Sequence, residues 1–313
     1  FTSHGQMRWL KVYEIPEGSR GSRGKAMVNL FELAEGEKVQ SMLTADEVDV
    51  DDVYLVFATR NGRVKKTKLN EFRHLRRTAI RAIALEDDDE LISVKRCTDD
   101  QQIMLFSAHG MACRFNSGDA RSMGRNTRGV RGIRLRSDDD AVVAMEVVEP
   151  NNDILAITAN GMGKRSCIGF GNAQEDKEQG VDGYRLTNRG GKGVTNIKLK
   201  DGDRVVDVHR VEAGLDMMLT TVNGQIVRFP ADEVRTIGRA SQGVRIINLA
   251  DDDYVASVSP VQQLDEDEEN GEEIDVEAED ETPAGDESSP GSETNAGDES
   301  SPGSGTNADD SVE

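Results

Sequence analysis

The sequence is poor in aromatic side chains and has no long hydrophobic run. One Trp, four Tyr and eight Phe make up only 4% of its 313 residues. No stretch approaches the run of about 18 apolar residues that a membrane-spanning helix requires, and no signal-peptide pattern is visible. We therefore expect a cytoplasmic protein without membrane contact. Scarce aromatic rings also disfavour a surface on which single-stranded bases stack.

Cysteine is rarer still, and its spacing excludes the common metal sites. Cys97, Cys113 and Cys167 form no Cys-x-x-Cys pair and lie near no pair of histidines. We expect them to be buried strand residues or reduced thiols, with no metal bound. The four histidines are scattered and the four tyrosines lie in no recognisable catalytic context. We therefore predict that this chain has no catalytic residue and no cofactor of its own.

Basic residues are absent from the C-terminal segment. Residues 265–313 hold 20 of the 59 acidic residues and none of the 38 basic ones, so residues 1–264 are close to neutral although the whole chain carries −21. Such a composition cannot bury enough apolar surface to offset its ordering entropy. The sequence predicts a folded domain over residues 1–262 and a disordered acidic tail over residues 263–313.

An eight-residue cassette recurs along the folded part. It consists of a polar residue, Gly or Ala, three variable residues, an apolar residue, one more variable residue and Leu. The copies are Arg23–Leu30, Thr78–Leu85, Arg128–Leu135, Lys192–Leu199 and Gln242–Leu249. Their Gly or Ala positions are 55, 50, 64 and 50 residues apart. Repeats of this length are typical of propellers and related arrays, in which one unit cannot bury its own apolar face.

Each cassette is followed by the same local patterns in a fixed order. An acidic turn comes first, then a β-branched run, then two apolar runs around Asn-Gly or His-Gly. Asn-Gly between apolar runs is a strong hairpin signal, because a type I′ turn needs positive φ at both central residues. The hairpins are expected around His4-Gly5, Asn61-Gly62, His109-Gly110, Asn160-Gly161 and Asn223-Gly224. Four strands per unit predict an all-β, propeller-like toroid of four-stranded blades.

The two ends of the repeat array are expected to be irregular. Phe1–Tyr13 would be the second half of a first blade whose opening strands lie upstream in a longer polypeptide. We expect Tyr254–Val261 to form one more strand, which would pair with this first blade and close or nearly close the ring. Gly169–Leu186 is an insertion in the fourth unit.

Basic residues recur at two places in each unit, the outgoing hairpin strand and the loop before the cassette. Equivalent positions of a toroid lie on one rim, where regularly spaced cations suit a bent polyanion. The alternative is that Lys and Arg are simply polar strand residues. The acidic residues lie instead in the turns, which favours the cationic rim. The candidate contacts are Arg20, Arg23, Lys25, Lys65, Lys66, Lys68, Arg73, Arg76, Arg77, Arg121, Arg125, Arg128, Arg131, Lys164, Arg165, Arg189, Lys192, Arg228, Arg235 and Arg239.

The stretch before the fourth cassette concentrates these features. Asn188–Val194 contains Gly190, Gly191 and Gly193 between and beside Arg189 and Lys192. Glycine lets the backbone turn at positive φ, and cations beside a turn can reach phosphate oxygens together with its N–H groups. An isolated copy would fit a solvated hairpin turn equally well. Its place in a repeated cassette favours phosphate binding.

Several of these stretches resemble the C-terminal domain of DNA gyrase A. The similarity extends over residues 1–262 and rests on Trp9–Tyr13, Ser22–Lys25, Val28–Leu30, Gly62–Lys66, Met123–Thr127, Gly129–Leu135 and Asn160–Arg165. The resemblance implies a β-pinwheel, usually of six blades, whose basic rim wraps duplex DNA. It also implies that the fragment serves ATP-dependent negative supercoiling by a type II topoisomerase. The catalytic tyrosine and the site for ATP and Mg would belong to other parts of the enzyme. The implied protein partners are the N-terminal region of a dimeric gyrase A and gyrase B.

Two departures from the family pattern keep alternatives open. The family's hallmark box, Gln-Arg-Arg-Gly-Gly-Lys-Gly, belongs to a first-blade region that would precede Phe1. The closest match here, Asn188–Gly193, lies in a later blade and lacks the Gln. The topoisomerase IV paralogue, which shares the fold but has degenerate boxes, is therefore the alternative within the family. A protein-binding propeller and, less favoured, a propeller enzyme are the alternatives outside it.

Overall fold

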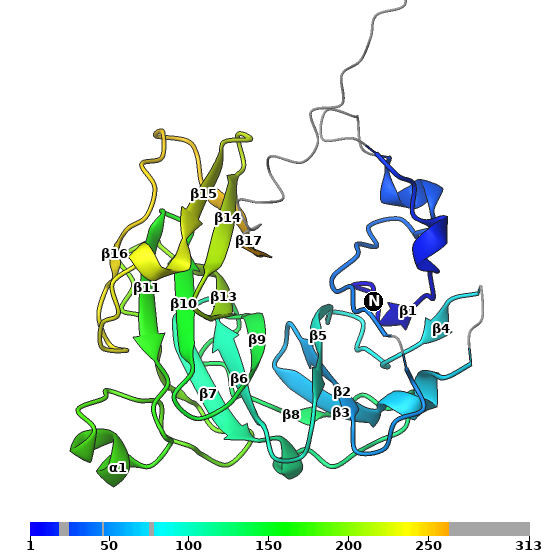
Figure 1. The fold of residues 1–313 in the computed structure, drawn as a ribbon, viewed down its shortest axis with the longest axis horizontal. Coiled ribbons are helices and arrows are strands. Elements are labelled where there is room, and N and C mark those ends of the chain that lie inside the picture. The colour runs from blue at the N-terminus through cyan, green and yellow to red at the C-terminus, as the bar shows by residue number, and fades with distance from the viewer. Residues whose placement is uncertain (19–24, 46, 75–77, 263–313) are drawn as a thin grey trace, which may run out of the picture. The chain divides into compact units, whose positions relative to one another are not determined.

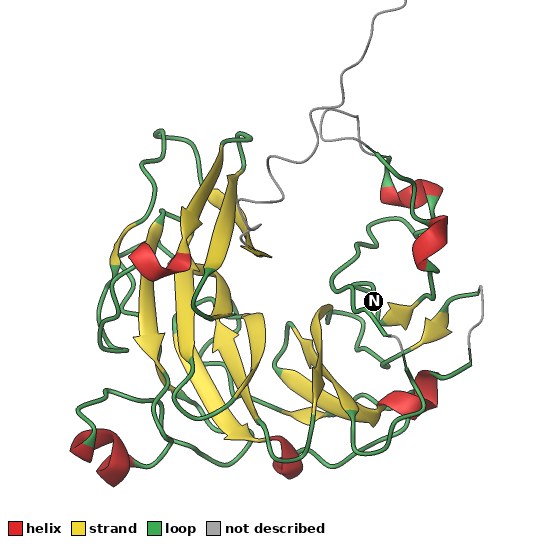
Figure 2. Cartoon of the chain, in the orientation of Figure 1, coloured by secondary structure: helices red, strands yellow, loops and turns green. Residues whose placement is uncertain are grey.

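Strands dominate the structure (Figure 2). The computed structural model describes residues 1–18, 25–45, 47–74 and 78–262, so the predicted acidic tail lies outside the described residues. Within them the helical elements are short: α1 (Ala173–Glu178) and the 3₁₀ turns η1 (Val12–Glu14), η2 (Met27–Asn29), η3 (Leu69–Phe72), η4 (Ser117–Asp119) and η5 (Ala231–Glu233). No helix in this part of the chain is long and apolar enough to cross a membrane. The predicted all-β class is confirmed.

The described strands form five antiparallel sheets that follow one another along the chain (Figure 1). The three with four strands are β5–β2–β3–β8 (Leu91–Cys97, Tyr54–Thr59, Arg63–Lys68, Val130–Arg131), β9–β6–β7–β12 (Val142–Val148, Gln102–Ser107, Met111–Asn116, Val194–Thr195) and β13–β10–β11–β16 (Val205–Val211, Asp153–Thr158, Met162–Cys167, Val244–Arg245). The other two are β17–β14–β15 (Val255–Gln262, Leu215–Thr221, Ile226–Pro230) and β1–β4 (Gln6–Met7, Ile80–Arg81). Four-stranded blades are thus confirmed for three units.

The strands of one blade do not come from one repeat. Hairpin β2–β3 pairs with β5, which the chain reaches only after the next cassette, and with β8, which belongs to the cassette after that. The same exchange recurs in the next two sheets. The last strand also differs from expectation: β17 pairs with β14, with Met218 opposite Ser259, and not with the first blade. The order of the strands was visible in the sequence, but their partners were not.

The cassette glycine lets each cassette dock on the last hairpin but one before it in the sequence. Gly129 has φ +77°, and a Cβ there would lie 2.6 Å from the carbonyl oxygen of Val64 on β3. Only glycine allows both this conformation and this approach. The hairpin glycine completes the contact, because Gly62 O accepts hydrogen bonds from the N–H groups of Gly132 and Ile133 at 2.8 and 3.2 Å. Equivalent bonds reach Gly5, Gly110 and Gly161, so the same contact joins four successive pairs of units.

The last aspartate of each acidic turn fixes the tip of a hairpin. Asp140 Oδ1 accepts hydrogen bonds from the backbone N–H of His109 at 3.0 Å and of Ala141 at 3.0 Å. Asp89, Asp203 and Asp253 make the same pair of bonds in their own blades. Asp89, Asp140 and Asp253 are buried. These acidic turns therefore hold the hairpins in place, in addition to breaking the chain between strands.

The hydrophobic cores lie between neighbouring sheets. One cluster joins Val56 and Val64 of one blade to Ile103 and Phe115 of the next, and two further clusters repeat this arrangement. Since each blade has a neighbour on both faces, its central strands β2, β6 and β10 are almost wholly buried.

Polar contacts also join the strands at one edge of successive sheets. Lys95 of β5 lies 2.6 Å from Glu146 of β9, and His209 of β13 lies 3.8 Å from the same carboxylate. Burial lowers the pKa of His209, but its hydrogen bond to Asp207 and the charge of Glu146 outweigh burial, so the pKa is raised overall. An ionic contact at this edge therefore bridges three blades.

We expect Asp140→Ala to lower the free energy of unfolding by about 1–3 kcal/mol, because two backbone N–H groups lose a buried acceptor. The matched control is Asp138→Ala, an exposed acid of the same turn, which should change stability by less than about 0.5 kcal/mol. Urea denaturation followed by circular dichroism measures both variants. Equal stability of the two would show that the turn is held by its backbone alone.

Candidate nucleic-acid interface

The sheet order places the cassette strands at an outer edge. In each four-stranded sheet the cassette strand (β8, β12 or β16) lies at one edge, and the strand that contacts the next blade (β5, β9 or β13) lies at the other. Cations of the cassettes and of the loops before them therefore lie far from the inter-blade contacts of the inner edge. This outer edge is the candidate interface.

Most of the predicted contact residues are accessible. Lys25, Lys68, Arg73, Arg121, Arg128, Arg131, Lys192, Arg228 and Arg235 are exposed. Arg125, Arg165, Arg189, Gly190, Gly191, Gly193 and Arg239 are half-buried. Arg20, Arg23, Arg76 and Arg77 lie outside the described residues.

Three predicted contacts are buried, so the expectation that they lie on the surface is wrong. Lys65, Lys66 and Lys164 are 0%, 2% and 1% exposed. Neighbouring blades cover both faces of the hairpin strands that carry these lysines, so their side chains do not face solvent. Their ammonium groups bond inside the protein: Lys66 Nζ donates to the Asp99 carboxylate and, at 2.9 Å, to Ser117 O. As they stand, these three lysines cannot touch a phosphate.

The arginines that follow in the hairpins also have partners within the protein. Arg165 lies 2.9 Å from Asp153 and 2.6 Å from Asp232, and Arg228 lies 2.7 Å from Asp216. Their guanidinium groups thus have carboxylate partners already. Binding of a phosphate would have to compete with these carboxylates.

Arg114 occupies the same hairpin position in the intervening blade and was not among the predicted contacts. It is buried, and its Nη1 donates to the carbonyl oxygens of Ile168 and Tyr184 at 2.7 and 2.9 Å. Burial lowers its pKa to about 10. Ile168 directly precedes the insertion and Tyr184 lies near its C-terminal end, so Arg114 anchors both ends of the insertion to β7. The sequence did offer a signal for Arg114: it lies four residues after Gly110, as Lys66 lies four residues after Gly62.

The box-like loop is anchored to the preceding cassette. Gly190 has φ +83°, and its N–H donates to Gly132 O at 2.7 Å. Gly191 O accepts from the N–H of Arg134 at 2.8 Å. The Arg189 guanidinium donates to the carbonyl oxygens of Asp119 and Arg131. Lys192 is exposed and makes no hydrogen bond or ion pair with another described residue. The two cations of this loop therefore differ, one holding the loop and one open to a ligand.

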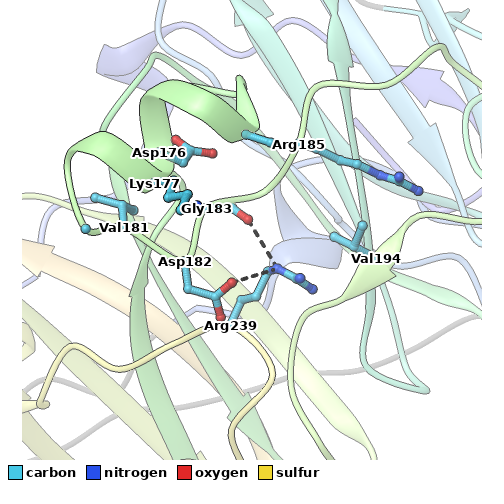
Figure 3. Close-up of a pocket in the computed structure, with 10 residues that line it drawn as sticks. Asp176, Lys177, Val181, Asp182, Gly183, Arg185, Val194 and Arg239 are labelled. Carbon is cyan, nitrogen blue, oxygen red and sulfur yellow. Dashed lines mark hydrogen bonds and ion pairs between the residues drawn. The ribbon is translucent and has the colours of Figure 1, made fainter.

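The insertion forms a pocket with the loop before the fifth cassette (Figure 3). The insertion contains the helix α1, whose Asp176 is buried. A carboxylate oxygen of Asp176 accepts a hydrogen bond from the backbone N–H of Phe170 at 2.6 Å. Arg239 Nε donates to Gly183 O at 3.1 Å and lies 3.4 Å from Asp182. Arg185 lines the same pocket and is exposed. The insertion thus adds one cation to the edge and fixes another.

The structure adds exposed cations that were not among the predicted contacts. They occupy repeated cassette positions, the fourth in Arg81 and Arg245 and the seventh in Arg134 and Lys198. Arg131, which was predicted, also holds the fourth position. Aligning the cassettes residue by residue would have revealed these cations, because every cassette has the same eight positions. The outer edge is therefore more basic than predicted.

We expect Arg189→Ala to lower the free energy of unfolding by about 1–2 kcal/mol, because two carbonyl groups lose a charged donor. Lys192→Ala, in the same loop, should change it by less than about 0.5 kcal/mol. Thermal and urea unfolding of the two variants give the comparison. A larger loss for Lys192→Ala than for Arg189→Ala would contradict this division of roles.

Known proteins share both the sequence pattern and the fold. A family model described as the DNA gyrase C-terminal domain, beta-propeller, matches residues 1–46, 54–98, 101–149, 152–166, 180–212 and 216–262. DNA gyrase A of Haloquadratum walsbyi (strain DSM 16790 / HBSQ001) is 41% identical over 272 residues, which cover 85% of this chain and 30% of that protein. DNA gyrase A of Staphylococcus aureus (strain MRSA252) is 37% identical over 285 residues, covering 90% and 30%. The chain thus spans about 30% of the length of these relatives.

Solved structures agree with this assignment. A structure of the DNA gyrase A C-terminal domain matches with a TM-score of 0.67 and 25% identity, covering 83% of this chain and 80% of that one. The C-terminal domain of DNA topoisomerase IV matches with a TM-score of 0.71 at 22% identity, covering 84% and 78%, and shows the common fold. The resemblance seen in the sequence is confirmed: the chain belongs to the family of the DNA gyrase C-terminal domain.

Proposed function

We propose that this chain binds duplex DNA without sequence specificity and wraps it along the outer edge of its blades. The observation that carries the proposal is the recurrence of exposed cations at equivalent positions in several units. Arg81, Arg131 and Arg245 share one cassette position, and Arg128 and Lys192 share another. Cations repeated at a fixed interval suit the regular phosphates of a duplex and carry no base readout.

Several separated contacts are needed for wrapping. Bending a duplex smoothly costs on the order of 1–6 kcal/mol per 20–30 bp, so one phosphate contact cannot hold it bent. At least four units each supply exposed cations among the described residues. Each unit would hold a short stretch of duplex and direct it to the next unit.

The relatives are whole DNA gyrase A proteins, which supports a role in a larger reaction. Within such an enzyme the wrapped duplex would be delivered for strand passage and ATP-dependent negative supercoiling in the cytoplasm. The catalytic residues, ATP and Mg would be supplied by the N-terminal region of a dimeric gyrase A and by gyrase B. This fragment would contribute binding and bending only. A role in topoisomerase IV is the alternative within the family.

A protein-binding propeller is the alternative outside the family, and DNA binding separates the two. We expect the association constant for duplex DNA to fall steeply as the salt concentration rises. Lys192→Ala should reduce the log–log slope by about 0.9, the value for one phosphate contact. Arg210→Ala, on β13 at the opposite sheet edge, is the matched control and should leave the slope unchanged. A flat salt dependence would contradict the DNA interface.

The same protein should also trap writhe in a plasmid. Relaxation with topoisomerase I in its presence, followed by deproteinisation, should leave a shifted topoisomer distribution if DNA is wrapped. Binding with a normal salt slope but no shift would mean that the duplex is bound without being wrapped.

We further propose that the acidic tail competes with DNA. The segment after Leu264 carries 20 acids and no base, and it is tethered to a domain with a cationic edge. A tethered polyanion acts at high effective concentration. The alternative is a solubilising tail that never contacts the domain.

Deleting residues 265–313 should therefore tighten DNA binding, most strongly at low salt, where screening is weakest. Titrations of the full chain and of the truncated chain at several salt concentrations test this. Equal affinity at low salt would leave only the solubilising role.

A further inference from the structure

We infer that Lys65 and Lys164 are positioning residues, which hold the DNA-facing loops of the following units in a fixed conformation. The inference rests on the proposed function. It concerns two lysines that cannot themselves reach DNA.

The two lysines occupy the same place in different blades. Each lies three residues after a hairpin glycine, Gly62 or Gly161, and each is almost fully buried. Both point at the loop that precedes the cassette docked on their own hairpin. Lys65 Nζ donates to Arg125 O at 2.6 Å and also to Ala82 O at 2.5 Å. Lys164 Nζ donates to Gly238 O at 3.0 Å and to Arg239 O.

One of the two carbonyls bonded by each lysine belongs to a candidate contact, Arg125 or Arg239. Arg125 and Arg239 are the fourth residues before their cassette glycines, and the exposed Arg128 follows in the first of these loops. A charged donor makes hydrogen bonds about twice as strong as a neutral one. Fixing the carbonyl of Arg125 therefore fixes the point from which its guanidinium extends.

Neither lysine forms an ion pair with a described carboxylate. The pKa of both ammonium groups is lowered to about 7, mainly by burial; for Lys65 the charge of Arg125 also lowers the pKa, whereas that of Glu71 raises it. For Lys164, Asp182 raises the pKa and Arg239 lowers it. The two ammonium groups hydrogen-bond only to carbonyl oxygens, and Lys65 Nζ also lies 5.3 Å from the centroid of the Phe57 ring. A buried cation held in this way is an expensive way to fill space, since an apolar side chain would do so without desolvating a charge. What the lysine adds over an apolar residue is its hold on the loop.

The intervening unit supplies an independent comparison. Its equivalent residue is Cys113, whose Sγ lies 3.7 Å from Gly132 O and carries no charge. In that unit the loop is held from its own side: Arg189 bonds to Asp119 O and Arg131 O. Each of these three loops is therefore anchored by at least one cation, from the hairpin for Lys65 and Lys164 and from the loop itself for Arg189. The loop bonded to Lys164 is also held from its own side, by Arg239. The anchoring is retained although the residue that provides it changes.

A double-mutant cycle on the full chain tests the inference. We expect Lys65→Met to weaken binding to a duplex by about three- to tenfold in the wild-type background and by less than about twofold in Arg125→Ala/Arg128→Ala, because coupled residues give non-additive effects. Lys68→Met removes the same charge from the exposed end of the same strand. Lys68→Met should weaken duplex binding by the same factor in both backgrounds. Circular dichroism and unfolding curves establish that each variant is folded.

The outcomes separate the two proposals. If the wild type shows no salt-dependent affinity for the duplex, both fail. If the wild type binds, but Lys65→Met leaves the affinity unchanged or lowers it by the same factor in both backgrounds, only the positioning role is wrong. Should Lys65→Met not fold, the same cycle with Lys164→Met and Arg235→Ala/Arg239→Ala decides.

A measurement without lysine variants gives a further check. Since the pKa of Lys65 is about 7, raising the pH from 6 to 8.5 should neutralise it and weaken its hold on the loop. DNA affinity should therefore fall more in the wild type than in Arg125→Ala/Arg128→Ala. An identical pH profile for both proteins would overturn the positioning role.

Discussion

The structure depends on one backbone contact, the docking of each cassette on the last hairpin but one before it in the sequence. Gly62 O accepts two N–H groups from residues 132–133, and Gly129 lets the two chains approach closely enough to do so. The contact places the cassette strand at the outer edge of the earlier blade and leaves the core between blades. Consecutive blades are therefore linked in three ways: by the continuous chain, by packing of their cores and by the exchange of strands. The cations of the cassette reach the outer edge for the same reason.

Basic residues in this fold have two different roles. Several on the hairpin strands, such as Lys65 and Arg114, are buried between blades and bond to carbonyl groups, whereas Lys68 and Arg228 on such strands are exposed. Those in the cassettes, such as Arg131 and Lys192, are exposed. Burial removes the first group from contact with any polyanion, yet the loops it holds carry part of the second. A substitution of a buried cation and one of an exposed cation can thus weaken DNA binding for different reasons.

The insertion shows how one unit departs from the pattern without disturbing it. Residues 167–179 are not matched by the family model, and α1 lies among them. Arg114 bonds to Ile168 O and Tyr184 O, which lie on either side of α1 in the sequence, so both ends of this segment are held next to β7. Tyr184 is fully buried, and its hydroxyl donates to Asn196 of the next cassette at 2.7 Å. The insertion therefore projects from a stem that is firmly fixed at both ends.

The class of the fold, the repeat and the hairpins at Asn61-Gly62, His109-Gly110, Asn160-Gly161 and Asn223-Gly224 could be predicted from the sequence. These features are local, because glycine favours a turn and the cassette repeats at a nearly constant interval. The expected type I′ geometry was wrong, since Gly62 has a positive φ but Asn61 does not. The residues of the box-like loop were also visible, because glycine and cations concentrate there. Strand partners, and which lysines are buried, were decided only by the tertiary structure. Period-two alternation says that Lys65 and Lys66 point to opposite faces of their strand, but not that a neighbouring blade covers each face. Burial of that kind depends on residues far apart in the chain, and no local pattern encodes it.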